Sequence, residues 1–492
     1  MENKPKHIHI VGICGVGTGA LAVAFHQAGW KVTGSDKGFY PPVSTNLAEA
    51  GIEYYAGWHP EKIGKPDVVM VGGSGTSLSN PEVVYAKEHG IPFYPYAQIL
   101  QKYFIRPNSI VTAGTWGKTT TSALLSFVLI EAGMNPSYFT GGLSMSHPTG
   151  ALIDASISKW SVVEGDEYQT AIYDKLPKFA YYDPTHLLLT SVSWDHADLY
   201  PTEADYFKTF EKLVAGIPAS GVIVACADDE GVNKIIGAAA AKVVTYGMNE
   251  EVDYRYRSVQ HTKAGIAFDI DHAGQAYHVA SPMLGRYNVE NIAGVFAMAH
   301  HIGISADKII AALAAFKGIK RRLERRLDGQ AGDAAQNSGI TVIDTHAPTP
   351  EKAASGLESI REVYGKKIIA IYEPNIGGRQ KSSIGAYDKS TDDRNGGAFR
   401  DADLVIIPRL TKLKIDETKT DPKDQPLEGQ ELADHISHAK KEAIYIEDDA
   451  ALVSKVIAEA RSGEDAGAGN VIVFLGSHGF RGMIEETVAK LK

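Results

Sequence analysis

One segment, residues 109–121, constrains the fold of this chain more than any other. A β-branched apolar run leads into a glycine-containing turn, and Gly117 then opens an expected helix. Backbone N–H groups at a helix N-terminus, together with the positive end of the helix dipole, favour bound polyphosphate. Lys118 adds a positive charge for the phosphates, and the Thr119 hydroxyl is a ligand for the accompanying Mg²⁺. A full P-loop has glycine where Thr112 stands, so the alternative is an incidental Gly-Lys-Thr.

Composition narrows the class of protein. A chain of 492 residues, 44% hydrophobic and 22% charged, predicts about three globular domains. Its net charge of −10 argues against a general nucleic-acid binder but allows anionic small substrates. Two distant cysteines, Cys14 and Cys226, fit a reducing compartment. The sequence shows no signal-peptide pattern and no apolar run of about 18 residues, so we expect a cytoplasmic protein without a membrane partner.

The first part of the chain alternates short apolar strands with amphipathic helices, which is typical of a parallel sheet. The turn after the first expected strand, Gly12–Gly19, departs from G-x-G-x-x-G by carrying Cys14 at the second glycine position. Asp36 ends the second expected strand, near the place of a ribose-binding acid. The turn predicts a pyrophosphate near a helix N-terminus, and a dinucleotide-dependent oxidoreductase is one alternative.

Two further α/β units follow. Residues 251–282 have the alternation of hairpins, and a Gly/Ala/Asn-rich segment near residue 328 marks a boundary. The last unit again alternates strands and helices. We therefore predict an α/β protein with domains at 1–108, 109–330 and 331–492.

Acidic residues follow two expected strands of the middle unit. Glu164, Asp166 and Glu167 come after one strand, and Asp195 and His196 come after the next. Carboxylates at the carboxyl ends of strands beside a phosphate cradle organise metal in many nucleotide enzymes. The alternatives are a solvated strand end for the acids, and a general base or a satisfied interior residue for the histidine.

A basic cluster, Arg321 and Arg322 with Lys317 and Lys320 before them, falls at the end of the middle unit. Runs of charge are usually solvated. At a domain boundary, an arginine is also placed to neutralise charge on a transferred phosphate.

Five motifs stand in a fixed order along the chain: Gly114–Thr121, Glu164–Tyr168, Asp195–Tyr200, Gly285–Asn291 and Phe316–Arg322. In order and spacing they resemble the Mur ligases, the ATP-dependent amino-acid and peptide ligases of peptidoglycan synthesis. The resemblance covers essentially the whole chain. It implies a UDP-sugar-binding Rossmann-like N-terminal domain, a central P-loop ATPase-type domain with a mainly parallel sheet plus a small hairpin region, and a Rossmann-like C-terminal domain that holds the incoming amine.

The resemblance also implies roles for individual residues. The catalytic residues would be Lys118, His196 and Arg321 or Arg322, and the Mg²⁺ ligands Thr119, Glu164 and His196. The ATP site would comprise Gly114, Thr115, Trp116, Gly117, Lys118, Thr119, Thr120, Asn288, Asn291 and Asp344. The UDP-sugar site would comprise Gly12, Gly15, Val16, Gly17, Ser35, Asp36 and Ser74.

The N-terminal unit favours one branch of the family. Cys14 in the first turn and the Tyr-Pro-Pro segment within 34–45 resemble the branch that recycles the cell-wall tripeptide L-alanyl-γ-D-glutamyl-meso-diaminopimelate onto UDP-N-acetylmuramate. The alternative acceptor is free L-alanine. Trp116 and Tyr287 stand where the family usually has histidine, and Ser193 stands in place of an acid. These departures leave a non-catalytic nucleotide-binding scaffold as a further alternative.

Overall fold

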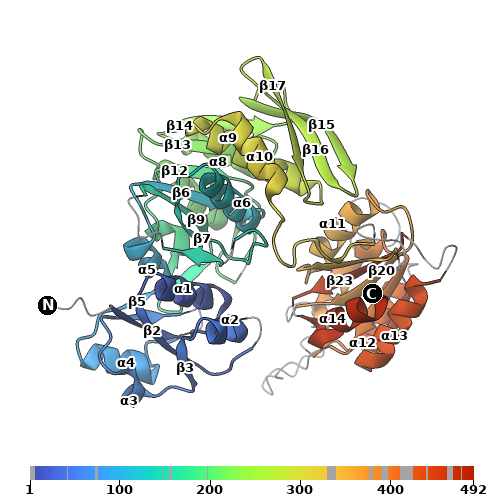
Figure 1. The fold of residues 1–492 in the computed structure, drawn as a ribbon, viewed down its shortest axis with the longest axis horizontal. Coiled ribbons are helices and arrows are strands. Elements are labelled where there is room, and N and C mark those ends of the chain that lie inside the picture. Colours follow the sequence, from blue (N-terminus) through green and yellow to red (C-terminus); the bar gives the residue numbers. More distant parts are fainter. Residues whose placement is uncertain are drawn as a thin grey trace. The chain divides into compact units, whose positions relative to one another are not determined.

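The protein is described by a computed structural model (Figure 1). The described residues are 6–40, 43–72, 76–147, 149–153, 158–196, 198–329, 339–375, 381–388, 397–410, 425–438, 442–462, 469–477 and 479–492. They form two compact units. The first comprises residues 1–260, 266–282 and 287–319, and the second 261–265, 283–286 and 320–492.

A five-stranded sheet forms the N-terminal part of the first unit, in the order β3-β2-β1-β4-β5 with every neighbouring pair parallel. The apolar residues of the central strand are fully buried, as a strand covered on both faces requires. The strands are β1 (His7–Val11), β2 (Lys31–Asp36), β3 (Glu53–Ala56), β4 (Val68–Val71) and β5 (Phe93–Pro95). The helices are α1 (Val16–Gln27), α2 (Val43–Glu49), α3 (Pro60–Ile63), α4 (Pro81–Glu88) and α5 (Tyr96–Tyr103). The predicted alternation of strands and helices is confirmed.

The rest of the first unit is built on a ten-stranded sheet in the order β17-β16-β15-β14-β13-β12-β6-β9-β7-β8. It is parallel from β15 to β7, and the β7–β8 and β16–β17 pairs are antiparallel. The strands are β6 (Asn108–Ala113), β7 (Ser137–Phe139), β8 (Ala151–Leu152), β9 (Trp160–Gly165), β12 (His186–Leu189), β13 (Val222–Cys226), β14 (Lys242–Gly247), β15 (Tyr254–Thr262), β16 (Gly265–His272) and β17 (Gln275–Ser281). A separate hairpin joins β10 (Gln169–Ala171) and β11 (Asp174–Pro177). The hairpins expected over 251–282 are therefore present.

Helix α6 (Lys118–Glu131) follows β6 directly and is almost entirely buried. It packs against α9 (Tyr287–His301), α10 (Ala306–Ala315) and strand β9. Because α6 is enclosed, its first turn is fixed at the carboxyl edge of the ten-stranded sheet. The remaining helices of this part are α7 (Glu203–Ala215) and α8 (Glu230–Ile235).

The second unit contains a six-stranded sheet in the order β18-β19-β23-β20-β21-β22, parallel except for the antiparallel β18–β19 pair. The strands are β18 (Glu324–Leu327), β19 (Thr341–Thr345), β20 (Ile368–Glu373), β21 (Leu404–Pro408), β22 (Ala443–Ile446) and β23 (Val471–Gly476). The helices are α11 (Pro350–Arg361), α12 (Gly429–His438), α13 (Asp449–Ala460) and α14 (Met483–Leu491). The predicted α/β class thus holds in both units.

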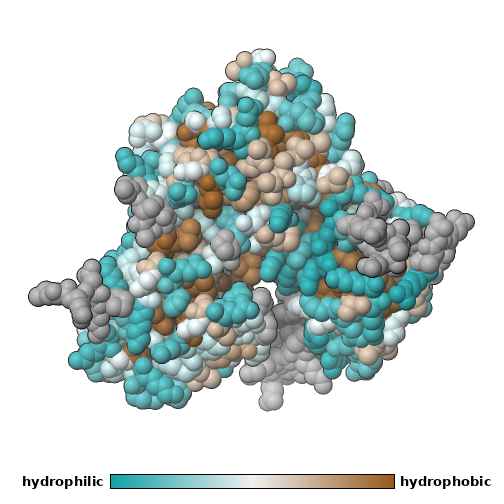
Figure 2. All heavy atoms as spheres, viewed as in Figure 1, coloured by the Kyte–Doolittle hydropathy of each residue, from teal (hydrophilic) through white to brown (hydrophobic). Residues whose placement is uncertain are grey.

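Hydrophilic residues cover much of each unit on the face shown in Figure 2, with apolar residues in scattered patches. Among the described residues, no helix combines the length and apolar character needed to cross a membrane. The large apolar side chains that are exposed among these residues are Val16, Tyr40, Leu78, Trp116, Ile172, Leu176, Trp194 and Met248.

Candidate active site

The predicted phosphate cradle is a tight glycine loop between β6 and α6. Gly117, at a φ of 84°, immediately precedes the helix, and Gly114 has a φ of 144°. A Cβ atom on Gly117 would lie 2.4 Å from the Asn291 Oδ1 atom, so the loop leaves no room for a side chain there. The loop is held from outside, because the Thr115 N–H donates to the Ser191 carbonyl at 2.9 Å. Glycine is therefore required at position 117, both for its backbone conformation and because no side chain fits there.

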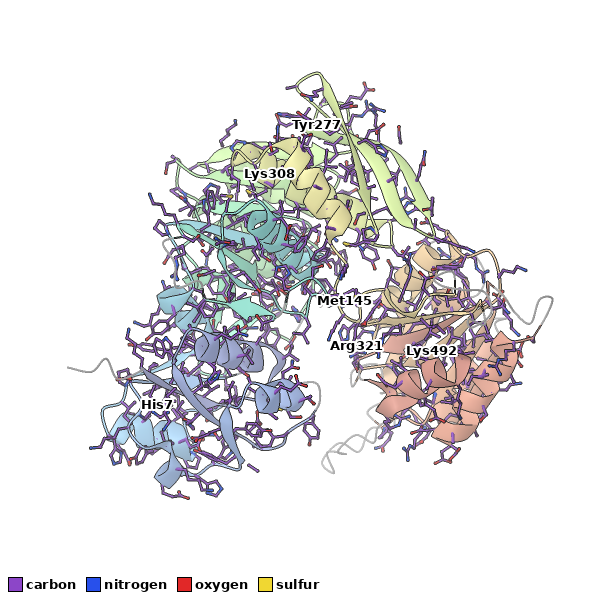
Figure 3. All side chains as sticks on the ribbon, viewed as in Figure 1. His7, Met145, Tyr277, Lys308, Arg321 and Lys492 are labelled. Atoms are coloured by element: carbon purple, nitrogen blue, oxygen red, sulfur yellow. The ribbon has the colours of Figure 1, made fainter. Side chains whose placement is uncertain are left out.

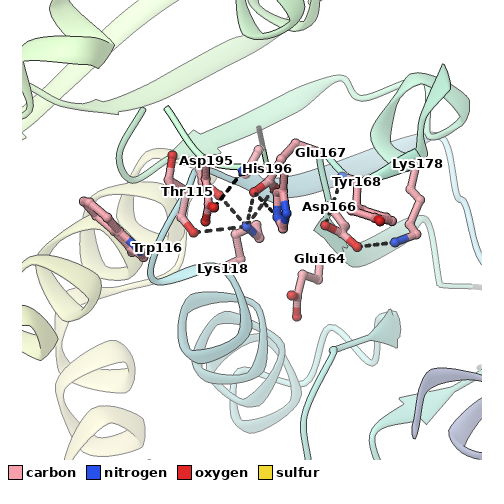
Figure 4. Close-up of polar contacts among 12 residues, drawn as sticks. Thr115, Trp116, Lys118, Glu164, Asp166, Glu167, Tyr168, Lys178, Asp195 and His196 are labelled. Atoms are coloured by element: carbon pink, nitrogen blue, oxygen red, sulfur yellow. Dashed lines mark hydrogen bonds and ion pairs between the residues drawn. The ribbon is translucent and has the colours of Figure 1, made fainter. Parts of the chain in front are cut away.

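Lys118 lies inside this loop (Figure 4). Its Nζ atom donates to the carbonyl oxygens of Gly114 at 2.7 Å and Thr115 at 3.2 Å. It also forms an ion pair with Glu167 Oε2 at 2.7 Å. Burial alone lowers the pKa of Lys118, but Glu167 and the nearby carboxylates of Asp166 and Glu164 outweigh it and raise that pKa. The lysine is therefore a fixed positive charge at the start of α6.

Glu164 and Thr119 form the second polar pair of the site. The Thr119 hydroxyl donates to Glu164 Oε1 at 3.1 Å, and the Gly141 N–H donates to Oε2 at 2.6 Å. Burial raises the pKa of Glu164, and Lys118 opposes this shift. A hydroxyl beside a carboxylate fits Mg²⁺, which takes oxygen ligands and keeps positions for phosphate oxygens. Within the described part of the chain, no cluster of three or more His, Cys, Asp or Glu residues is placed to hold a metal.

His196 lies beside the carboxylate of Glu167. Its Nε2 atom is 3.8 Å from Glu167 Oε1, and its ring is 5.0 Å from the ring of Tyr168. Its backbone φ of 54° is unusual for a residue other than glycine, and the neighbouring Asp195 carboxylate accepts its N–H at 2.7 Å. The structure thus brings His196 and Lys118 together on Glu167, and the joint metal role of His196 with Glu164 stays a prediction.

The two asparagines predicted to border the adenine, Asn288 and Asn291, are buried near the start of α9. Asn291 Nδ2 donates to Asn288 Oδ1 at 3.0 Å, and Asn291 Oδ1 accepts from the Thr121 hydroxyl at 3.2 Å. Asn291 therefore joins α9 to α6 directly behind the glycine loop. Thr120, a further predicted residue of the ATP site, is buried in the first turn of α6.

The first glycine turn lines a cavity of about 560 Å³. Asp36 holds the turn, because its Oδ2 atom accepts the Cys14 N–H at 2.8 Å. The Ser35 hydroxyl points into the interior and donates to the buried Glu82. Ser74 lies outside the described residues. The lining residues are Gly12, Gly15, Val16, Gly17, Thr18, Asp36, Lys37, Trp58, Gly72, Thr76, Ser77, Ser79, Asn80 and Tyr96.

In the second unit, Arg321 is tied to the carboxyl edge of the six-stranded sheet (Figure 3). Its guanidinium donates to the carbonyls of Gly476 and Ser477, each at 3.0 Å, and its Nε atom lies 3.4 Å from Asp344 Oδ1. Burial raises the pKa of Asp344, opposed by Arg321. Arg322 donates to the carbonyl of His346 at 3.2 Å. The roles of Arg321 or Arg322 toward the γ-phosphate and of Asp344 toward the ribose remain predictions.

Comparison with known proteins decides the family. Residues 7–106 match the family profile described as the catalytic domain of the Mur ligase family, and residues 111–299 match the Mur ligase middle domain. A UDP-N-acetylmuramate–L-alanyl-γ-D-glutamyl-meso-2,6-diaminoheptandioate ligase from Haemophilus influenzae is 31% identical over 379 residues, covering 75% of this chain and 80% of that protein. The chain belongs to the Mur ligase family.

A relative named for L-alanine as the acceptor aligns with more of this Mur ligase than the tripeptide ligase does. A UDP-N-acetylmuramate–L-alanine ligase from Rhodopseudomonas palustris is 30% identical over 480 residues, covering 94% of this chain and 95% of that protein. The fold is shared with the crystal structure of the UDP-N-acetylmuramate–alanine ligase of Thermotoga maritima, at a TM-score of 0.75, 23% identity and 98% coverage of both chains.

Family membership makes the chain an ATP-dependent, peptide-bond-forming ligase of peptidoglycan synthesis. This decides against the oxidoreductase alternative, and measurable ATP turnover would exclude the non-catalytic scaffold. Trp116, the residue of the glycine loop that departs from the usual family sequence, is 55% exposed. In Figure 4 the ring lies on the side of the loop away from the carboxylates.

The partner of Lys118 was missed by sequence reasoning, which placed Glu167 among three acids but chose Glu164 alone as a ligand. The three-residue spacing between Glu164 and Glu167 was the available signal. Glu164 lies within β9, whereas Glu167 lies beyond the end of that strand, where the chain turns back toward the glycine loop. Two acids three residues apart therefore face two different partners.

Proposed function

We propose that this Mur ligase joins L-alanyl-γ-D-glutamyl-meso-diaminopimelate to the lactyl carboxylate of UDP-N-acetylmuramate, using ATP, in peptidoglycan recycling. The observation that carries the chemistry is the glycine loop in which Lys118 lies beside the Thr119–Glu164 pair. This arrangement suits the transfer of a phosphoryl group to a carboxylate, which needs positive charge and little else from the protein.

The proposed reaction has two steps. A lactyl carboxylate oxygen attacks the γ-phosphorus of ATP, the bond to the β–γ bridging oxygen breaks, and ADP leaves. The acceptor amine then attacks the acyl carbon, loses a proton, and expels phosphate from a tetrahedral intermediate. Mg²⁺ on Thr119 and Glu164 would neutralise phosphate charge. Lys118 would hold the phosphate oxygens through both steps, since its charge is fixed by the surrounding loop carbonyls and Glu167.

Two features of the first glycine turn support the tripeptide branch as acceptor class. Cys14 and the Tyr-Pro-Pro segment distinguish this branch in sequence, and Cys14 contacts Tyr40, the first residue of that segment. The Tyr40 N–H donates to Cys14 Sγ at 3.4 Å. The relative from Haemophilus influenzae is named for the same tripeptide.

Free L-alanine is the second candidate acceptor. Its support is that the relative from Rhodopseudomonas palustris, named for L-alanine, aligns over 94% of this chain, against 75% for the tripeptide ligase. Both candidates use the same first step and differ only in the amine. A cytoplasmic location belongs to the proposal, in keeping with the two free cysteines, Cys14 and Cys226.

An acceptor profile tests the proposal. Purified protein is supplied with ATP, Mg²⁺ and UDP-N-acetylmuramate, and phosphate release is followed after addition of tripeptide or of L-alanine. We expect release with tripeptide at a kcat/KM at least tenfold above that with L-alanine, about 1.4 kcal/mol of discrimination. A preference for L-alanine would assign the second function. Release that needs no acceptor, or no release at all, would contradict both.

A further inference from the structure

Glu167 is a buried carboxylate to which the predicted mechanism gives no task. Its side chain is 1% exposed, and it follows the end of β9 at the rim of the ten-stranded sheet. Two tyrosines beyond β12 hold it in place, Tyr200 before α7 and Tyr206 on α7. The Tyr200 hydroxyl donates to the Glu167 carbonyl at 2.6 Å, and the Tyr206 hydroxyl lies 3.4 Å from Oε1.

The carboxylate of Glu167 faces both predicted catalytic side chains of the first unit. Lys118 Nζ is 2.7 Å from Oε2, and His196 Nε2 is 3.8 Å from Oε1 (Figure 4). Tyr206 extends the connection, because its hydroxyl also lies 2.9 Å from the Thr115 hydroxyl in the glycine loop. One rigidly held anion therefore touches the lysine and the histidine at once.

The hydrogen-bonding capacity of Lys118 is fully used in this arrangement. An ammonium group has three donors, and the structure directs them at the carbonyls of Gly114 and Thr115 and at Glu167. Polyphosphate oxygens must therefore replace at least one of these acceptors. The nearby Glu167 charge also repels the triphosphate, which weakens nucleotide binding while the lysine stays aimed.

We infer that Glu167 is a positioning residue of the phosphoryl-transfer site, which orients Lys118 and His196 and weakens the binding of the nucleotide in its ground state. The inference rests on the proposed function. Removing the charge of Glu167 should act on binding and on turnover in opposite ways. The nucleotide gains affinity because a repulsive charge is gone, whereas turnover falls because two catalytic side chains lose a common anchor.

The test compares the full-length parent with Glu167→Gln. Binding of ADP with Mg²⁺ is measured by calorimetry, and kcat by phosphate release with all substrates present. We expect ADP to bind about tenfold more tightly and kcat to fall about 30-fold. A purely structural role would weaken binding or lower stability without this opposed pair of changes. Unchanged or weaker ADP binding, or an undiminished kcat, overturns the inference.

Two further variants separate the possible causes. Glu167→Asp keeps the charge but withdraws it by one methylene, so we expect a lower kcat at parental ADP affinity. If Glu167→Gln does not fold, this variant decides the question, and a parental kcat overturns the inference. Asp198→Asn removes an exposed charge that accepts the Tyr168 hydroxyl at 3.0 Å on the same rim. This control variant should change neither the ADP affinity nor kcat.

The two proposals fail in different ways. If the parent binds ADP but releases no phosphate under any acceptor, the proposed function is wrong, and the calorimetric comparison of the variants still tests the effect of Glu167 on the nucleotide. If the parent turns over normally and Glu167→Gln shows no opposed changes, only the inference about Glu167 is wrong.

Discussion

The first unit contains two glycine loops that are locally alike and chemically different. Each follows a buried parallel strand and leads directly into a helix, β1 into α1 and β6 into α6. Each contains a glycine at a φ of 84°, Gly12 in the first loop and Gly117 in the second. Each presents a helix N-terminus whose first turn is free of acidic side chains. Both are therefore suited to an anionic group.

The loops differ in the charges around them. In the second loop Lys118 lies inside the turn, and the partly buried Glu164 of β9 and the buried Glu167 beyond β9 lie close to it. In the first loop the acid at the end of the next strand, Asp36, instead accepts a backbone N–H of the loop itself. The first loop can hold a phosphate-bearing ligand in its cavity, whereas the second also has the charges that phosphoryl transfer needs. A glycine pattern alone predicts that the loop binds an anion. The side chains around the loop decide whether it can also support phosphoryl transfer.

Removing Lys118 should show the largest functional difference between the two loops. We expect Lys118→Ala to lower ATP-dependent phosphate release by at least about 10³-fold, since the charge on the transferring phosphoryl group is no longer matched. UDP-N-acetylmuramate binding, measured by calorimetry, should stay at the parental value. Lys37→Ala, in the lining of the first cavity, is the reverse control and should weaken sugar-nucleotide binding without loss of ATP affinity. Substantial turnover by Lys118→Ala would show that the second loop is not the phosphate cradle.

A second comparison replaces glycines of matched backbone conformation by alanine. Gly12, Gly29 and Gly117 have φ values of 84°, 83° and 84°. All three variants should lose about 1 kcal/mol of stability from the left-handed conformation. Gly117→Ala should lose more, because its Cβ would meet Asn291 at 2.4 Å, whereas at Gly29 nothing lies within 4 Å. Thermal denaturation that ranks Gly117→Ala no lower than Gly29→Ala would contradict the tight packing of the second loop.

The first loop is tested by removing its anchor. Asp36→Ala should raise the KM for UDP-N-acetylmuramate about tenfold, because a charge-assisted hydrogen bond to Cys14 is lost, and leave the KM for ATP unchanged. Asp67→Ala is the matched control, since Asp67 accepts the His7 N–H at 2.7 Å at the other end of β1. Equal effects of the two variants would refute the assignment of Asp36 to the sugar-nucleotide loop.

The last expected effect concerns stability in acid. His147 lies buried with Nε2 3.0 Å from the hydroxyl of Ser126 on α6, and burial lowers its pKa to about 4. Below about pH 6.5 the histidine is protonated in the unfolded chain but stays neutral in the folded protein until the pH approaches 4. The free energy of unfolding therefore keeps its full value at neutral pH and falls as the pH drops toward 4. Relative to pH 7.5, the parent should lose about 2 kcal/mol more stability at pH 5 than His147→Gln. Identical pH profiles in chemical denaturation would contradict this.

Much of this architecture was predictable because it follows from local pattern. The run before Gly117 and the helix after it are fixed by β-branched residues and by glycine, and both appear where expected. The hairpins β15 to β17 follow from alternation. The family was predictable from five motifs, because their order is read directly from the sequence and needs no three-dimensional information.

What the sequence left open depends on contacts between residues far apart in the chain. Ser35 was assigned to the sugar nucleotide, but its hydroxyl meets Glu82, which comes from α4 47 residues later. His196 was paired with Glu164 and lies beside Glu167, because the path of the chain beyond β9 decides which acid faces the loop. Neither contact leaves a periodic signal. The assignment of Ser35 to the sugar site stays a prediction.

The central claim, that the second loop activates a carboxylate, is tested most directly by isotope transfer. UDP-N-acetylmuramate labelled with ¹⁸O in its lactyl carboxylate is incubated with the protein, ATP, Mg²⁺ and tripeptide, and the released phosphate is analysed by mass spectrometry. If the carboxylate attacks the γ-phosphorus, each phosphate released on amide formation carries one ¹⁸O from the sugar. Phosphate without the label would show that water attacks ATP and would contradict the claim.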